Sequence, residues 1–272
     1  MSLAPASAAP ALRRIIMAAG WSGLGLIAVA VVLSDFLART AAGAVHVGVA
    51  LAAPSEQFPF GTDLLGRDIF SETLHGLSIT VRLAVMAALV AIVAGGLFGF
   101  VAARFPRPLR LAVRWATGVV AAVPALLLAV LLIGLTSRGF SGVAAGLAAA
   151  PLAFVRAFDR AQESSKSTHG EYARATGISA TALLRRNLVY EFRDTFLTTA
   201  ARALAAVTIT LSTASFLGFG AVPPFRDLGL MIAAAQTSYL QAWWTAAFPA
   251  LALLILILFA RLAAALDEGE RP

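Results

Sequence analysis

The sequence predicts an all-α integral membrane protein with six transmembrane helices. Of its 272 residues, 60% are hydrophobic and only 13% are charged, whereas a typical globular chain is about 45–50% apolar and about 25% charged. Apolar runs recur along the chain, and several are long enough to cross about 30 Å of hydrocarbon as a helix. The absence of cysteine and the three scattered histidines predict neither a disulfide nor a metal site built by this chain.

The first segments divide into a short tail and a first span. Residues 1–12 are Ala, Pro and Ser-rich without periodicity, which predicts a disordered cytoplasmic tail. Arg13 and Arg14 then precede an apolar run, so we expect the first transmembrane helix at residues 13–37. This run exceeds the roughly 7–15 residues of a signal-peptide core, which favours an uncleaved helix over a secretory signal.

Residues 38–79 are mixed in polarity and are predicted to form an extracytoplasmic loop. They contain the segment PFGTDLLGRDIFSETLHG, Pro59 to Gly76. Glycines beside threonine, aspartate and arginine predict hydrogen-bonded turns that lead into the next helix. The residues of this loop motif are Gly61, Thr62, Asp63, Gly66, Arg67 and Asp68.

A five-helix core is predicted over residues 80–267, followed by a polar cytoplasmic tail at 268–272. Its spans are expected near 81–103, 115–135, 142–158, 195–218 and 243–266. Gly95 and Gly99 allow another helix to approach closely in lipid. Pro124 permits a kink in the middle of its span, and the residues leave open whether that kink is a gating hinge or a tolerated bend.

Basic residues are distributed very unevenly between the two sides that six spans create. With the N-terminus inside, the inner segments hold Arg13, Arg14, Arg104, Arg107, Arg110, Arg114, Arg156, Arg160, Lys166, Arg174, Arg185, Arg186, Arg193, Arg261 and Arg271. The outer segments hold Arg39, Arg67, Arg138 and Arg226. The positive-inside rule therefore predicts that both termini and the polar segment 156–193 are cytoplasmic. Because the net charge of +7 follows membrane sidedness, we do not expect nucleic-acid binding.

The most polar stretch inside the core is GEYARATGISATALLRRNLVYE, Gly170 to Glu191. A short helix over Glu171–Ala175 can end at Gly177 in the left-handed conformation, and Ser179 is a plausible N-cap for a second helix. Helix, sharp turn and helix make a shape that can dock in a groove of another protein. An ordinary solvated amphipathic connector explains the pattern equally well.

Three stretches resemble the permease subunits of bacterial ABC importers, in the dipeptide, oligopeptide and nickel branch. The loop motif is similar to the family's Gly-Thr-Asp-x-x-Gly-Arg-Asp segment. Glu171, Ala173 and Gly177 match its cytoplasmic coupling motif, and SFLGFGAVPPFRDLGLMI, Ser215 to Ile232, resembles the segment that closes its fifth helix.

Two positions depart from the family's coupling motif. Tyr172 stands where the family usually has Ala, and Tyr190 stands where it ends in Pro. The second departure leaves the entry into the fifth helix open.

The resemblance implies a type I ABC importer permease fold and a set of partners. These are a second homologous permease, expected to make a heterodimer, two cytoplasmic ATPase subunits and an extracytoplasmic solute-binding protein. It assigns contact with the ATPases to Glu171, Tyr172, Ala173, Arg174 and Gly177. ATP and Mg²⁺ are expected on the ATPase chains and no cofactor or catalysis on this one, because the sequence has no Gly-x-x-x-x-Gly-Lys-Ser/Thr loop.

The resemblance leaves the transported solute open among peptides, nickel chelates and related compounds. A different class of function also fits the residues. A non-conducting membrane scaffold or assembly subunit would bind a soluble partner through the same loop.

Polar residues share one face of the fifth span, and they are candidates for lining a translocation pathway. They are Thr198, Arg202, Thr208, Ser212 and Ser215. Two other interpretations remain: the hydroxyls bond carbonyls of their own helix, or Arg202 pairs within a helix interface or extends to the membrane surface.

Overall fold

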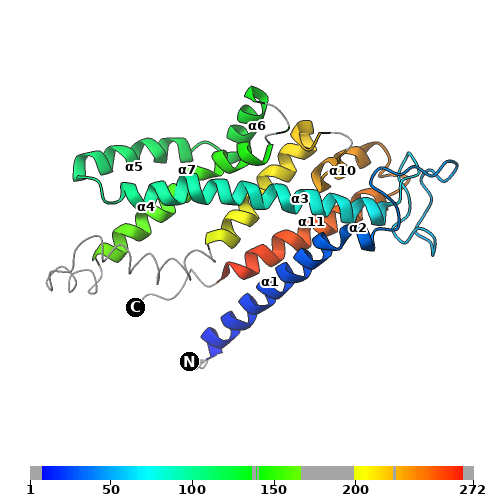
Figure 1. The fold of residues 1–272 in the computed structure, drawn as a ribbon, viewed down its shortest axis with the longest axis horizontal. Coiled ribbons are helices and arrows are strands. Elements are labelled where there is room, and N and C mark those ends of the chain that lie inside the picture. The colour runs from blue at the N-terminus through cyan, green and yellow to red at the C-terminus, as the bar shows by residue number, and fades with distance from the viewer. Residues whose placement is uncertain (1–7, 137–138, 140, 167–198, 223–224, 266–272) are drawn as a thin grey trace, which may run out of the picture.

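Long helices lie side by side along the longest dimension of the molecule in the computed structural model (Figure 1). The structure describes residues 8–136, 139, 141–166, 199–222 and 225–265. The first half contains α1 (Ala8–Val32), α2 (Ser34–Leu37), α3 (Ile69–Ala91), the π-helix η1 (Ile92–Leu97), α4 (Phe98–Ala102), α5 (Arg107–Ala121) and α6 (Ala125–Leu135). The second half contains α7 (Ser141–Lys166), the span Thr199–Phe219 with the π-helix η3 (Ser215–Phe219) at its end, α10 (Leu228–Ala234), the 3₁₀ turn η4 (Ala235–Thr237) and α11 (Trp244–Ala263).

Within the described ranges, five helices are long and apolar enough to cross a membrane. They are Leu12–Val32, Ile69–Leu97, Ser141–Asp159, Thr199–Phe219 and Trp244–Ala263. A sixth crossing exists if the pair α5 and α6 counts as one span. The predicted all-α membrane class is confirmed, because lipid requires each crossing segment to satisfy its own backbone hydrogen bonds.

The third predicted span is broken rather than kinked. α5 ends at Ala121, α6 begins at Ala125, and the two axes differ by 85°, as the turn between their labels shows (Figure 1). Pro124 is the residue that precedes α6, where its missing N–H costs nothing. α5 begins at Arg107, earlier than predicted, and contains no buried residue.

Two predicted boundaries also lie elsewhere in the structure. α1 begins at Ala8, so the predicted tail of residues 1–12 is helical in part, since alanine and leucine favour helix. α3 begins at Ile69, so the predicted loop of residues 38–79 ends about three helical turns early. Hydropathy does not indicate this helix start, because Ser71 and Glu72 are polar residues that are buried and accept hydrogen bonds from loop N–H groups.

Close contacts between backbones join α7 to the helix formed by α3, η1 and α4. A Cβ placed on Gly95 would lie 2.0 Å from the Ala150 carbonyl oxygen, and one on Gly99 would lie 2.4 Å from that of Phe154. The predicted role of these glycines in close helix approach is confirmed. α1 packs on α11 in the same manner, because a Cβ on Gly20 would lie 2.2 Å from a backbone atom of α11.

The bundle has two chemically different ends. The starts of α1 and α5 and the ends of α4, α7 and α11 gather at one end, while the loop of residues 38–68 and α10 occupy the other (Figure 1). We call the first the arginine-rich end, since the helix termini and the connection between α4 and α5 there carry Arg13, Arg14, Arg104, Arg107, Arg110 and Arg261. We call the second the loop end.

Candidate functional site

The loop motif folds into tight turns at the loop end. The Asp63 carboxylate accepts hydrogen bonds at Oδ1 from the backbone N–H groups of Leu65 (2.8 Å) and Arg67 (2.9 Å). Gly61 and Gly66 have φ values of 72° and 74°, in the left-handed region that glycine adopts readily. The predicted hydrogen-bonded turns are therefore present, and they leave the Leu64 and Leu65 side chains exposed.

Buried Thr62 ties this turn to the rest of the loop and to α11. Its hydroxyl accepts from the Ala52 N–H (2.8 Å) and donates to the Val49 carbonyl. Its own carbonyl accepts from Trp244 Nε1 (3.2 Å) at the start of α11. The turn is thus held in place by a helix 182 residues further along the chain.

Asp68 joins the loop motif to α3. Its side chain accepts from the Phe70 and Ser71 N–H groups at the helix start (3.3 and 3.2 Å) and from the Ser71 hydroxyl (2.6 Å). A side chain that satisfies the first N–H groups of a helix stabilises it by roughly 1 kcal/mol. The motif therefore starts α3 in a defined direction.

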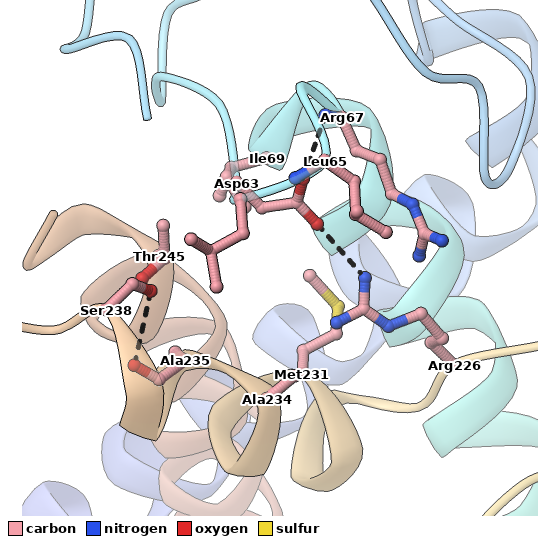
Figure 2. A pocket seen from close by; sticks show the side chains of 11 residues that line it. Asp63, Leu65, Arg67, Ile69, Arg226, Met231, Ala234, Ala235, Ser238 and Thr245 are labelled. Carbon is pink, nitrogen blue, oxygen red and sulfur yellow. Dashed lines mark hydrogen bonds and ion pairs between the residues drawn. The ribbon is translucent and has the colours of Figure 1, made fainter. Parts of the chain in front are cut away.

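Arg226, from the second half of the chain, pairs with one acidic residue of the loop motif and one of α3. Its Nη1 lies 3.4 Å from Asp63 Oδ2 and 3.7 Å from Glu72 Oε2. Its side chain is 17% exposed, that of Asp63 is 15% exposed and that of Glu72 is 6% exposed. Figure 2 shows Arg226 reaching up to Asp63 beside the pocket. Such shielded pairs are screened by salt much less than surface pairs.

A pocket of about 210 Å³ lies between the loop motif and the segment from α10 to the start of α11. Its lining is Asp63, Leu64, Leu65, Arg67, Ile69, Arg226, Met231, Ala234, Ala235, Ser238 and Thr245. Apolar side chains dominate; of the charged groups, Asp63 and Arg67 come from the loop motif and Arg226 from the segment before α10 (Figure 2). Arg67 Nε is buried without a hydrogen-bond partner in the part of the chain that the structure describes.

Three of the five pathway candidates, Thr208, Ser212 and Ser215, are buried within the chain's own helix packing. Thr208 is fully buried and donates to the Leu204 carbonyl (2.6 Å), and Arg202 Nη2 donates to the Ala264 carbonyl beyond α11 (3.4 Å). These contacts agree with the two simpler interpretations of the polar face. Ser212 is buried with its hydroxyl unpaired among the described residues, Ser215 is buried, and Thr198 lies outside the described residues.

Asp227 is a buried residue of the loop end that was not among the predicted site residues. Its Oδ2 accepts from the Ser215 hydroxyl and the Ala221 N–H (2.9 Å), and its Oδ1 accepts from the Leu230 N–H in the first turn of α10 (3.1 Å). It thereby holds the end of the Thr199–Phe219 span against α10.

Glu72, Arg226 and Trp244 also have roles at the loop end that the sequence patterns did not predict. Arg226 and Asp227 are neighbours in the sequence, and both lie inside the stretch Ser215–Ile232, which resembles the segment that closes the family's fifth helix. Glu72 is a carboxylate at the start of an apolar helix. The family-like stretch and the carboxylate at a helix start could each have indicated these residues from the sequence.

The residues assigned to ATPase contact lie outside the described residues: Glu171, Tyr172, Ala173, Arg174 and Gly177. α7 continues to Lys166 and leads directly into that segment. Among the described residues, no group of three or more His, Asp or Glu side chains is placed to hold a metal ion.

Comparison with known proteins decides the family. The model of the family described as "Binding-protein-dependent transport system inner membrane component" matches residues 92–268. The chain belongs to this family. The match runs from η1 through α11, so it includes the segment of residues 167–198 and Arg226.

Relatives of this family member are named as transport permeases. A putative peptide transport system permease protein of Brucella suis is 26% identical over 85% of this chain and 78% of its own length. The di/tripeptide transport system permease protein of Pseudomonas aeruginosa is 26% identical over 74% and 67%. The glutathione transport system permease protein of Escherichia coli O6:K15:H31 is 30% identical over 75% and 68%. The resemblance to ABC importer permeases of the dipeptide and oligopeptide branch is confirmed.

Proposed function

We propose that this family member is the transmembrane subunit of an ATP-driven importer that moves a peptide or peptide-like solute across the bacterial inner membrane. The family match over residues 92–268 carries the proposal. Relatives named for peptides, di- and tripeptides and glutathione favour a peptide-like solute. A nickel chelate is the competing solute class, and transport of labelled substrates separates the two.

The two ends of the bundle support an orientation. The arginine-rich end faces the cytoplasm, since cytoplasmic segments of membrane proteins carry an excess of Lys and Arg. The loop end then faces outward, where an extracytoplasmic binding protein delivers the solute. Both termini are cytoplasmic in this arrangement.

Coupling to ATP hydrolysis is assigned to the segment that follows α7. Two partner ATPase chains bind ATP and Mg²⁺, and their closure acts on Glu171 to Gly177. The Gly95 and Gly99 contacts support a rigid connection, because backbones that touch without intervening side chains cannot slide past each other freely. Displacement of α7 would then move α3 and α4, and alternating access would follow from rocking against a second permease.

The test is ATP hydrolysis and substrate uptake by the reconstituted complex, with binding protein and a labelled dipeptide. A variant with Glu171→Ala and Gly177→Arg is expected to assemble but to lose at least about tenfold of the substrate-stimulated hydrolysis. Arg107→Gln, also at the arginine-rich end but outside the coupling segment, is the control. Unchanged stimulation in the double variant would refute the coupling role. Failure of the wild type to bring down any ATPase would instead favour the non-conducting scaffold.

A further inference from the structure

The loop end carries a cationic group that no acidic side chain among the described residues neutralises. Asp63 Oδ1 is used by two backbone N–H groups and its Oδ2 by Arg226. Glu72 is used by Arg226 and by the Gly43 N–H. Arg67 therefore has no carboxylate partner in the described ranges, and its Nε is buried and unpaired. A donor without a partner is unfavourable, so a carboxylate that pairs with the Arg67 guanidinium would stabilise a bound partner.

Exposed apolar residues stand beside this group. Leu64 and Leu65 are 48% and 54% exposed on a turn bounded by Asp63 and Arg67. Hydrocarbon does not cover a turn flanked by two charged residues, because charged groups are costly there. Two neighbouring exposed leucines beside an apolar pocket give a partner protein apolar surface to bury.

The size of the pocket favours a single inserted side chain over a complete solute. Pockets for drug-sized ligands are usually about 300–1,000 Å³, while this one is about 210 Å³. Protein interfaces commonly place one aliphatic or aromatic anchor in such a pocket, with arginine among the favoured neighbours.

We propose that Leu64, Leu65, Arg67 and the adjoining pocket form a docking point for the extracytoplasmic binding protein. The binding protein inserts an aliphatic side chain into the pocket and places a neighbouring carboxylate against the Arg67 guanidinium. This assignment rests on the proposed importer function, because it requires the loop end to face outward. The ion pair between Arg226, Asp63 and Glu72 fixes the wall against which the anchor packs.

The experiment measures binding of the binding protein to the complete transporter in lipid nanodiscs, by biolayer interferometry. The probe is the binding protein that stimulates hydrolysis in the reconstitution above. Arg67→Gln and Leu65→Ser are each expected to weaken its Kd about tenfold. The wild-type Kd is expected to rise with salt, and that of Arg67→Gln to respond much less, since rim charges act through screened attraction.

Two substitutions serve as matched controls. Val47→Ser changes an apolar residue of the same loop that is 98% exposed and does not line the pocket. Arg107→Gln removes the same charge from the opposite end. Both controls are expected to bind within twofold of the wild type. All variants should keep the wild-type thermal transition, because Leu65 is 54% exposed and the Arg67 side chain forms no hydrogen bond within the described residues.

The outcomes separate this site from the general function. If the wild type binds and is stimulated while Arg67→Gln and Leu65→Ser bind equally well, the docking point is wrong and the importer function stands. If the wild type neither binds nor responds to any binding protein, both proposals fail. A loss of the second permease from the purified complex, or weaker binding of free solute with unchanged binding-protein Kd, would assign the surface to another occupant and overturn the proposal.

Discussion

Replacement of Asp227 by alanine offers the sharpest test of how the loop end is held together. The carboxylate accepts three hydrogen bonds: from the buried Ser215 hydroxyl, from the Ala221 N–H and from the Leu230 N–H. Hydrogen bonds to a charged group contribute about 1.5–3 kcal/mol each, and the Leu230 bond acts as a helix cap that contributes about 1 kcal/mol.

Two charge-assisted bonds at the lower value and one cap give a loss of about 4 kcal/mol for Asp227→Ala. Asp227→Asn keeps the size and one acceptor oxygen, so we expect about half of that loss. Ser215→Ala combined with Asp227→Ala should show a coupling free energy of about 1.5 kcal/mol.

The assay is reversible unfolding in mixed detergent and SDS micelles, followed by circular dichroism. Thr213→Ala is the control, because its exposed hydroxyl bonds only the Ile209 carbonyl of its own helix, and surface changes of this kind stay within about 0.5 kcal/mol. A loss for Asp227→Ala no larger than that of the control would refute the reasoning.

The remaining stability predictions concern helix contacts. Gly95→Ala should lower the free energy of unfolding by about 2–3 kcal/mol, since its Cβ would lie 2.0 Å from the Ala150 carbonyl oxygen. Gly134→Ala is the control, because a Cβ there meets no atom within 4 Å, and it should be neutral or slightly stabilising. Melting temperatures compare the two variants, and equal losses of stability would contradict the close contact. Arg114 and Asp159 form an exposed ion pair, with a nearest N–O distance of 2.9 Å and side-chain exposures of 49% and 42%. A double-mutant cycle should give a coupling free energy of about 0.2–1 kcal/mol that falls as salt is added. A larger coupling that does not depend on salt would contradict an exposed pair.

The break between α5 and α6 illustrates how far local sequence reasoning extends. Pro124 predicted a departure from regular helix at the correct place, because its ring prevents continuation. The angle of 85° depends on what the flanking segments contact. α5 lies against α7, where Arg114 pairs with Asp159, and that pairing is a property of the folded chain.

The loop motif illustrates the same division within the site. Glycine and aspartate spacing predicted its turns, since these residues accept left-handed backbone and bond nearby N–H groups. The pairing of Asp63 with Arg226 crosses 163 residues, and nothing in the spacing of either segment specifies it. The pathway candidates show the same limit: two of the described members, Thr208 and Arg202, form hydrogen bonds within the chain's own helix packing.

The sequence by itself determined the membrane class, the approximate places of the apolar segments and the resemblance to importer permeases. Hydropathy and charge act locally and sum along the chain, so they can be evaluated before the chain folds. Only the tertiary structure decided which polar side chains meet: Asp63 with Arg226, Ser215 with Asp227 and Thr62 with Trp244. These contacts form because packing brings distant segments within hydrogen-bonding distance, where a buried polar group must find a partner or be destabilised.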